Sequence, residues 1–439
     1  MSCESVETMN LFFYEGPAGC GKTTALIDKL KNHLLDHPLL DGQYVLGLTM
    51  MHGARQRLSE KLKTISELKC GFQCSTFDSF AWRIVSRWRS LYKEISEEEF
   101  PEDFDATCNS AAKLLSIDIV RKWVAATHPI ILVDEAQDCK KGRLGILQEL
   151  TKSCVVLVAA DAFQDLFDTE QSESVMWLQS VTNSTVLIQN HRTRVDGLLK
   201  SARSLREGNG FLGGTNCQVK SVASHSIAVH LVAYFLLNNQ ARKVAILTPT
   251  KPEKSKFISN TIEILRLGGI KLKNVSKPFS PQKIKWETDV TALEQRIKEE
   301  IGLPEEPDLI VNEYDLNLTA TSAGIQELHQ WIRRQRSLRG VGTFTVVEII
   351  KQISAICHHI RAFRSLNINN IRAMTIHQAK NQEFDGVVVL WPYEVGTNAE
   401  SNRRLLYNAI TRAKRSCLIL IQDTPKLGRI NKPPFVVAR

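Results

Sequence analysis

The chain has 439 residues, of which 43% are hydrophobic and 23% are charged, and its net charge is +9 at pH 7. This length allows two or more domains with separate cores, and the composition excludes a disordered or collagen-like chain. The positive charge suits a polyanionic partner without proving one.

Cysteine spacing, hydropathy and the first residues argue against a zinc protein, a membrane protein and a secreted protein. The ten cysteines include no C-x-x-C pair, which argues against a zinc site and indicates reduced thiols in a cytosolic setting. No apolar run approaches the roughly 20 residues of a membrane span. The first ten residues include Glu4 and Glu7 and lack a secretory signal pattern. We therefore expect a cytoplasmic protein without a membrane-embedded part.

The first motif in the chain is typical of a phosphate-binding loop. Residues 16–24 fit the pattern G-x-x-x-x-G-K-[ST], between a stretch with strand character at 11–14 and helical spacing at 25–30. In such a loop, backbone N–H groups and the helix N-terminus surround phosphate oxygens, the lysine reaches the β- and γ-phosphates, and the threonine hydroxyl holds Mg²⁺. We expect a catalytic role for Lys22 and a metal-binding role for Thr23. The predicted nucleotide-binding residues are Gly16, Pro17, Ala18, Gly19, Cys20, Gly21, Lys22, Thr23 and Thr24.

Strand and helix patterns alternate through the first part of the chain. The predicted strands are 44–49, 72–76, 129–133 and 154–160, and a helix is predicted at 54–62. This alternation predicts a parallel sheet that binds ligands at the C-terminal ends of its strands.

Two acidic residues follow the apolar strand at 129–133 directly. Asp134 is placed to bind Mg²⁺, and Glu135 is placed to polarise an attacking water, with burial and the neighbouring carboxylate tuning it as a base. For an isolated pair, two exposed acids at a helix start are the alternative. The phosphate loop favours the catalytic interpretation.

The second part of the chain repeats the alternation with one interruption. The predicted strands are 243–247, 372–376, 386–390 and 417–421, and the predicted helices are 198–206, 254–267 and 402–411. The segment from about 268 to 367 has a different composition, rich in Lys and Pro, with predicted helices at 292–301 and 346–363. We therefore interpret this segment as an insertion. The fold class predicted is α/β, with two parallel-sheet lobes and helical insertions.

Eight motifs, counting the phosphate loop, occur in the order found in superfamily 1 helicases. Residues 134–138 read Asp-Glu-Ala-Gln-Asp and match that family's Asp-Glu-x-Gln-Asp box. The other six motifs are resembled by residues 48–52, 76–80, 161–164, 189–193, 375–384 and 403–413. The chain therefore resembles the UvrD/Rep/PcrA group of superfamily 1A DNA helicases over nearly its whole length.

The resemblance implies a domain organisation. It places a RecA-like lobe 1A at 1–188, with a reduced 1B-like insertion at about 81–128. Lobe 2A would also be RecA-like and would be formed by 189–267 and 368–439. A reduced 2B-like insertion would occupy 268–367.

The resemblance also implies roles beyond the phosphate loop. Arg192 and Arg412 would approach the γ-phosphate across a cleft and stabilise transition-state charge, whereas a surface salt bridge is the alternative for either residue alone. Gln164 would act as a catalytic residue that links the γ-phosphate to the nucleic-acid surface. Glu383 would accept a hydrogen bond from the ribose, and His191 occupies the position of an adenine-stacking tyrosine.

Nucleic acid is expected to cross the tops of both lobes. Hydroxyl and backbone N–H groups would hold phosphates there, and aromatic faces would stack on bases. The matched positions are Thr49, His52, Thr76, Phe77, Thr375 and His377. The arginines between 83 and 89 and between 333 and 339 either add electrostatic contacts or form solvated helix faces.

Some positions depart from the family's pattern. No Gln-bearing segment precedes the phosphate loop, residues 167–170 replace the family's Tyr-Arg-Trp-Arg, and Asn381-Gln382 replaces Gly-Leu. The residues for hydrolysis are therefore kept better than those for handling duplex.

The sequence predicts an ATP- and Mg²⁺-dependent translocase or helicase that moves 3′ to 5′ on single-stranded or tailed DNA. The alternative is a regulatory NTPase subunit that senses DNA ends or nucleotide beside a nuclease, by analogy with Gabija-like antiphage systems. The third hypothesis is a degenerate scaffold that binds nucleotide without hydrolysing it, and the presence of all the predicted catalytic residues argues against this hypothesis.

Overall fold

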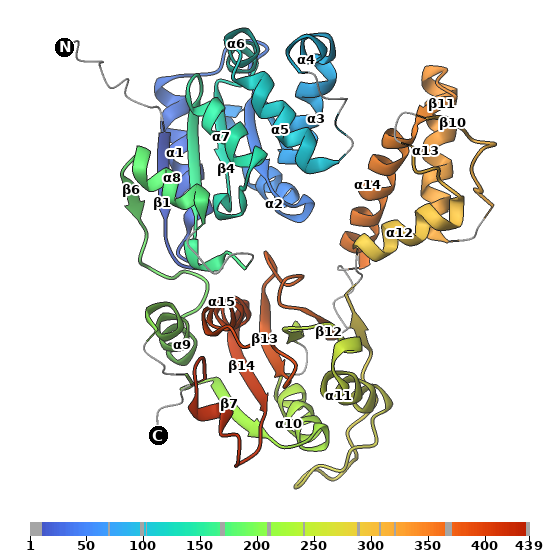
Figure 1. Ribbon diagram of the computed structural model, residues 1–439. Helices are drawn as coiled ribbons and strands as arrows, with labels where there is room; N and C mark the ends of the chain where they lie inside the picture. Colours follow the sequence, from blue (N-terminus) through green and yellow to red (C-terminus); the bar gives the residue numbers. More distant parts are fainter. Residues whose placement is uncertain are drawn as a thin grey trace. The chain divides into compact units, whose positions relative to one another are not determined.

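The computed structural model describes residues 11–68, 71–96, 101, 103–166, 172–208, 212–239, 242–287, 290–306, 309–319, 322–364 and 371–435. The chain forms two compact units. The larger unit contains Met1–Ile284 and Ile371–Arg439, and the smaller one contains Lys285–Asn370. The chain contains two six-stranded sheets, and each sheet with its helices is called a lobe below (Figure 1).

The first lobe is built on a parallel sheet. Its strands are β1 Leu11–Glu15, β2 Val45–Thr49, β3 Phe72–Thr76, β4 Ile130–Val133, β5 Val155–Ala160 and β6 Ser184–Val186. They are ordered β3-β2-β4-β5-β1-β6, and all their pairings are parallel. The strand that precedes the phosphate loop and the strand that precedes Asp134 are therefore separated by β5 alone, so both loops emerge at one edge.

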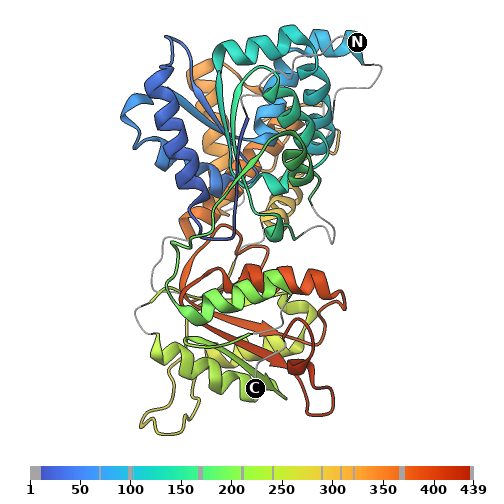
Figure 2. The ribbon, with the colours of Figure 1, turned by 90° about the vertical axis from the view of Figure 1, so that its left-hand side faces the viewer.

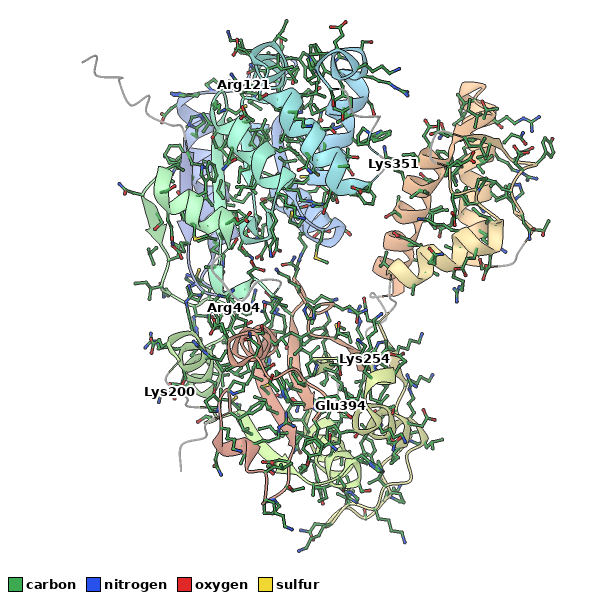
Figure 3. The ribbon with its side chains drawn as sticks, viewed as in Figure 1. Arg121, Lys200, Lys254, Lys351, Glu394 and Arg404 are labelled. Atoms are coloured by element: carbon green, nitrogen blue, oxygen red, sulfur yellow. The ribbon has the colours of Figure 1, made fainter. Side chains whose placement is uncertain are left out.

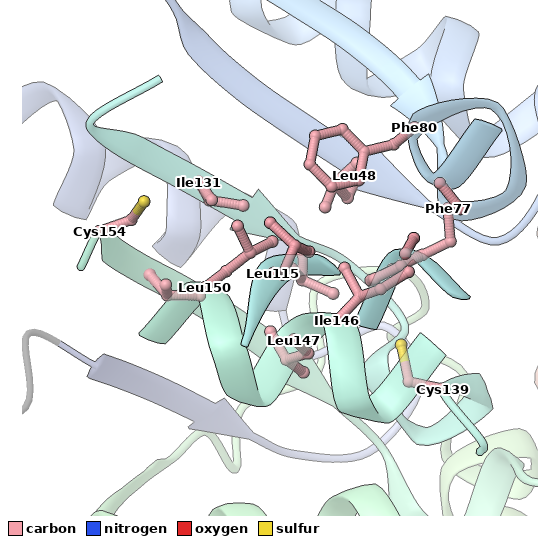
Figure 4. Close-up of a cluster of buried hydrophobic side chains, with 14 of the residues drawn as sticks. Leu48, Phe77, Phe80, Leu115, Ile131, Cys139, Ile146, Leu147, Leu150 and Cys154 are labelled. Atoms are coloured by element: carbon pink, nitrogen blue, oxygen red, sulfur yellow. The ribbon is translucent and has the colours of Figure 1, made fainter. Parts of the chain in front are cut away.

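Helices cover both faces of this sheet. They are α1 Lys22–Asp36, α2 His52–Leu62, α3 Phe77–Arg87, α4 Arg89–Ile95, α5 Phe104–Leu115, α6 Asp118–Thr127, α7 Gly142–Thr151 and α8 Glu173–Val181. Successive strand residues point to opposite faces. Ile131 and Val133 pack in one core with α3, α5 and α7, part of which Figure 4 shows, whereas Ile130 and Leu132 pack in another with α1 and α2.

The second lobe repeats this architecture. Its strands are β7 Cys217–Val222, β8 Val244–Thr248, β9 Ile284–Trp286, β12 Ile371–Thr375, β13 Phe384–Trp391 and β14 Ala413–Gln422, in the order β7-β14-β13-β8-β12-β9. The pairings that join β7, β14, β13, β8 and β12 are parallel. Its helices are α9 Asp196–Glu207, α10 His225–Asn238, α11 Lys256–Leu267 and α15 Ala399–Ile410.

The helices of the second lobe also form two layers. Helices α9 and α15 cover one face of the sheet, and α10 and α11 cover the other (Figure 2). Two parallel sheets flanked by helices confirm the predicted α/β class with two RecA-like lobes.

The smaller unit has a core of its own. It contains α12 Val290–Ile301, α13 Ala323–Arg339, α14 Val346–Arg364 and an antiparallel pair, β10 Ile310–Asn312 and β11 Thr343–Thr345. Ile297, Leu328 and Ile353 pack at its centre, and Lys351 lies on α14 (Figure 3).

The smaller unit begins after the expected start of the insertion at 268. Residues 268–284 are tied to the second lobe instead, because Gln282 N–H donates to Leu265 O and the Arg266 side chain donates to Ile284 O.

The described residues also bear on the membrane and cysteine expectations. Among the described helices, none has the length and apolar character that crossing a membrane requires. The cysteines that the structure describes are all free thiols.

Candidate active site

The phosphate loop connects β1 to α1 with its backbone turned into a cradle. Gly19 and Gly21 have φ of 81° and 86°, a left-handed conformation that glycine adopts without strain. Helix α1 begins at Lys22, so its first N–H groups, which have no partner within the helix, face the loop. The Lys22 ammonium donates to Gly16 O at 2.9 Å and Pro17 O at 3.2 Å. These features fit the binding of a phosphate chain.

The side chains of Thr23 and Asp134 meet beside the phosphate loop, where their oxygens could hold a metal ion. The Thr23 hydroxyl donates to Asp134 Oδ2 at 2.8 Å, and Glu135 N–H donates to Asp134 Oδ1 at 3.1 Å. Burial, followed by the charge of Glu135, raises the pKa of Asp134 above its ordinary value, although the Thr23 hydrogen bond opposes this. Among the described residues, no group of three or more His, Cys, Asp or Glu side chains is arranged so that it could hold a metal ion. A hydroxyl and one carboxylate suit Mg²⁺, which keeps several waters and shares substrate phosphates.

Glu135 is held in a constrained conformation beside this pair. Its φ of 62° is left-handed, which is uncommon for a non-glycine residue and costs free energy. The Gln137 side chain donates to Glu135 Oε2 at 2.5 Å and accepts from Asp161 N–H at 3.0 Å, which fixes the carboxylate. Burial acts to raise the pKa of Glu135, as expected, but Lys22 and Lys380 outweigh it and the pKa lies below its ordinary value. Glu135 is therefore ionised and able to accept a proton.

Arg192 and Glu383 form an ion pair near this carboxylate. Arg192 Nε donates to Glu383 Oε1 at 2.8 Å, and Arg192 Nη1 donates to Thr411 O at 2.9 Å. Lys414 contacts the second oxygen of Glu383 at 2.8 Å. Burial opposes ionisation of Glu383, but Arg192 and Lys414 prevail and lower its pKa to about 2. In this structure the Glu383 carboxylate therefore forms ion pairs with two cationic side chains, those of Arg192 and Lys414.

Arg412 follows the C-cap residue of α15, Thr411, and is buried. Its guanidinium donates to Asn408 O at 3.1 Å and to the Thr411 hydroxyl at 3.4 Å. Burial, followed by repulsion from Arg192, lowers the pKa of Arg412 to about 10, while Glu135 opposes this shift. Arg412 therefore stays cationic near pH 7 and forms one electrostatic group with Glu135 and Arg192.

Gln164 ends a short turn, Ala162–Gln164, that packs against α15. Its side chain is buried, and its carbonyl accepts from the Lys380 ammonium at 3.4 Å. The Phe163 ring meets Tyr407 edge-on at 5.0 Å, and the guanidinium of Arg404, seen on α15 in Figure 3, lies 5.8 Å from that ring. The structure therefore joins the predicted motifs at 161–164 and 403–413.

His191 lies against the phosphate loop, where the resemblance predicts a nucleotide contact. Its backbone N–H donates to Gly19 O at 2.7 Å, and a Cβ added at Gly21 would lie 3.2 Å from His191 Cδ2. The imidazole is exposed and so remains accessible to a base.

The predicted nucleic-acid residues lie at strand ends but differ in exposure. Thr49, Thr76 and Thr375 end β2, β3 and β12 and are buried, and the hydroxyls of the last two accept from N–H groups three residues on. His377 is exposed. The His52 side chain and residues 167–170 lie outside the described part of the structure.

Phe77 is buried, in contrast to the contact with nucleic acid that the sequence predicts. Only 1% of it is exposed, and it packs in the core of the first lobe with Leu48 and Ile146 (Figure 4). Its ring face is covered by apolar side chains, so the expected stacking of Phe77 on a base does not fit this structure.

Sequence reasoning assigned no role to several residues that the structure brings to this site. Asn190 and Tyr407 contact the phosphate loop, Lys380 pairs with Asp138, and Arg57 of α2 donates to Asn381 O. The motifs contained most of them, but the sequence did not show which atoms they touch.

Comparisons with known proteins found one family match, which lies in the second lobe. Residues 370–420 match the family model of the UvrD-like helicase C-terminal domain. A search of curated proteins found no match. The fold search found similarity to the complex of arterivirus nonstructural protein 10 (helicase) with DNA, at 10% identity and a TM-score of 0.38. That similarity covers 96% of this chain and 63% of the viral chain. The stretch similar to a UvrD-like helicase C-terminal domain therefore runs from β12 into β14 of the second lobe.

Proposed function

We propose that this protein is an ATP-driven translocase or helicase that moves 3′ to 5′ on single-stranded DNA. The observation that carries the proposal is the grouping of charges at one site. The phosphate loop and Glu135 come from the first sheet, and Arg192 and Arg412 come from the segments around the second. Two cations supplied by a second lobe are suited to stabilising charge on a transferring phosphoryl group.

Substrate binding begins at the loop. Lys22 would exchange its contacts with Gly16 O and Pro17 O for phosphate oxygens, which are stronger acceptors. Thr23 and Asp134 would hold Mg²⁺, which supplies charge neutralisation for the phosphates when bound.

Hydrolysis would use Glu135 as the general base. Its ionised carboxylate accepts a proton from the attacking water, and the Gln137 amide keeps the other oxygen in place. Arg412 and Arg192 would contact the γ-phosphate after leaving Asn408 O and Glu383. Because these contacts depend on second-lobe residues, hydrolysis would be coupled to motion between the lobes.

DNA binding is supported by the net charge of +9 and by the UvrD-like match. The backbone N–H groups at the ends of β2, β3 and β12 would hold phosphates, with His377 accessible beside them. The 3′–5′ direction and the choice of DNA rest on the family resemblance.

A regulatory NTPase that separates little duplex by itself is the second candidate. The burial of Phe77 favours it, because that burial removes an aromatic contact expected on the strand path. This candidate keeps the same hydrolytic site.

The test is ATP hydrolysis with and without single-stranded DNA, together with unwinding of 3′-tailed and 5′-tailed duplexes. We compare the wild type with Lys22→Ala and with Lys200→Ala, an exposed lysine on α9 (Figure 3). DNA-stimulated hydrolysis that Lys22→Ala alone abolishes, with unwinding of the 3′-tailed duplex, supports the proposal. Hydrolysis without unwinding favours the regulatory candidate, and hydrolysis that survives Lys22→Ala contradicts both.

A further inference from the structure

The crest of the phosphate loop, defined as Ala18 and Gly19, is held by residues from distant parts of the chain. Asn190 Nδ2 donates to Ala18 O at 2.8 Å, and His191 N–H donates to Gly19 O at 2.7 Å. From the other direction, Ala18 N–H donates to the Tyr407 hydroxyl at 2.9 Å. Both polar groups of Ala18 are thus bound by side chains that follow the first sheet in sequence.

The Tyr407 hydroxyl has a fixed hydrogen-bond direction. It donates to Asp161 Oδ2 at 3.0 Å, and the other oxygen of Asp161 accepts from Arg206 at 2.6 Å. A backbone N–H group can only donate, and an ionised carboxylate can only accept. The single phenolic proton therefore goes to Asp161, and the phenolic oxygen accepts from Ala18 N–H. Burial, followed by the charge of Asp161, raises the pKa of Tyr407, which keeps the hydroxyl protonated.

Asn190 connects the crest to Arg192. Its Oδ1 accepts from the N–H groups of Arg192 at 3.0 Å and Thr193 at 3.1 Å, while its amide nitrogen binds Ala18. A Cβ added at Gly19 would lie 2.7 Å from Arg192 Cβ and 3.0 Å from Asn190 Nδ2. The absence of a side chain at Gly19 therefore permits this close approach.

From these contacts we infer that Asn190 and Tyr407 are positioning residues that hold the phosphate loop in its nucleotide-binding shape. Neither side chain needs to touch the nucleotide, because each acts on the Ala18 peptide groups. The inference rests on the proposed binding of ATP at this loop. It adds that nucleotide affinity depends on α15 and on the segment before α9, and not on the first lobe alone.

The central test is Tyr407→Phe, which removes one oxygen and leaves Ala18 N–H without this acceptor. A buried donor without its partner weakens the geometry of the loop, so we expect the Kd of mant-ATP with MgCl₂ to rise about tenfold. The KM for ATP should rise with it while kcat changes less than threefold. Tyr92→Phe is the matched control, because the Tyr92 hydroxyl is also buried and accepts from Ser110 at 3.0 Å in the first-lobe core. We expect the Tyr92 variant to keep the wild-type Kd.

Asn190→Ala is a second, independent test of the positioning role. It removes the contact with Ala18 and the acceptor for Arg192 N–H, so both a higher Kd and a lower kcat are expected. Melting temperatures of all variants identify a folding defect, and if Tyr407→Phe does not fold, the Kd of Asn190→Ala decides.

An unchanged or lower Kd in Tyr407→Phe overturns the inference, as does an equal rise in Tyr92→Phe. These results leave the proposed function standing if the wild type hydrolyses ATP. A wild type that binds mant-ATP without hydrolysis contradicts the proposed function, and the Kd comparison still tests the positioning role.

Discussion

The Lys380 ammonium donates to both carboxylate oxygens of Asp138, at 2.6 and 2.7 Å, although the two residues are 242 positions apart. Their side chains are 6% and 9% exposed, so the ion pair is buried. Lys380 precedes β13, and Asp138 follows β4, so the pair joins the two lobes. Burial outweighs the attraction of Lys380 and raises the pKa of Asp138 from 3.8 to about 6. A buried ion pair of this kind is weak evidence for stability.

This shift predicts a pH dependence of stability. As pH rises from about 4 to about 6, the unfolded chain loses the Asp138 proton first and the native state keeps it longer, so the native state binds more protons. The contribution of Asp138 to the free energy of unfolding therefore falls across this window, by up to about 3 kcal/mol.

Asp138→Asn removes this titration. We expect the free energy of unfolding of the wild type, minus that of the variant, to fall as pH rises from about 4 to about 6 and to level off above this range. Urea unfolding at several pH values measures the difference. Asp385→Asn, which alters a surface ion pair with Arg415, should show no such trend. A difference that is constant or rises with pH would refute the assignment.

Glu135→Gln tests the proposed general base. The amide occupies the same volume but cannot accept a proton from water, so kcat should fall by about 10²–10⁴-fold. The Kd for ATP should stay within a few-fold of the wild type, because the phosphate loop is unchanged. Near-normal turnover in rapid-quench assays would assign the base to another residue.

Gln137→Ala tests how the base is held. Gln137 is fully buried, and its amide links Glu135 to Asp161 N–H, so its loss should lower kcat about tenfold without raising KM. Gln179→Ala is the matched control, since Gln179 donates to Glu15 at 3.0 Å on an exposed surface. Equal kcat values for the two variants would exclude a positioning role for Gln137.

The sequence predicted the fold well because hydrophobic periodicity is a local property. Nine predicted strands, including those at 72–76 and 417–421, correspond to strands of the two sheets. Helix α13 was not predicted, because polar residues dominate its sequence.

The candidate site could be predicted only in part. The motifs contained the loop, Asp134 and Glu135, and the structure brings Thr23 and Asp134 into contact. The contact of Ala18 with Tyr407 spans 389 positions and depends on how two sheets pack, which no local pattern encodes. The predicted stacking of Phe77 on a base does not fit the structure for the same reason. An aromatic residue after a strand can face either the core or the solvent, and Phe77 faces the core.

Pre-steady-state ATP hydrolysis by Arg412→Ala tests the composite site most directly, with the surface variant Arg415→Ala as its control. The proposed contact strengthens in the transition state, so kcat should fall by about 10³-fold or more while the Kd for ATP changes little. A kcat equal to that of Arg415→Ala, or a loss of binding with unchanged kcat, would contradict a site completed by the second lobe.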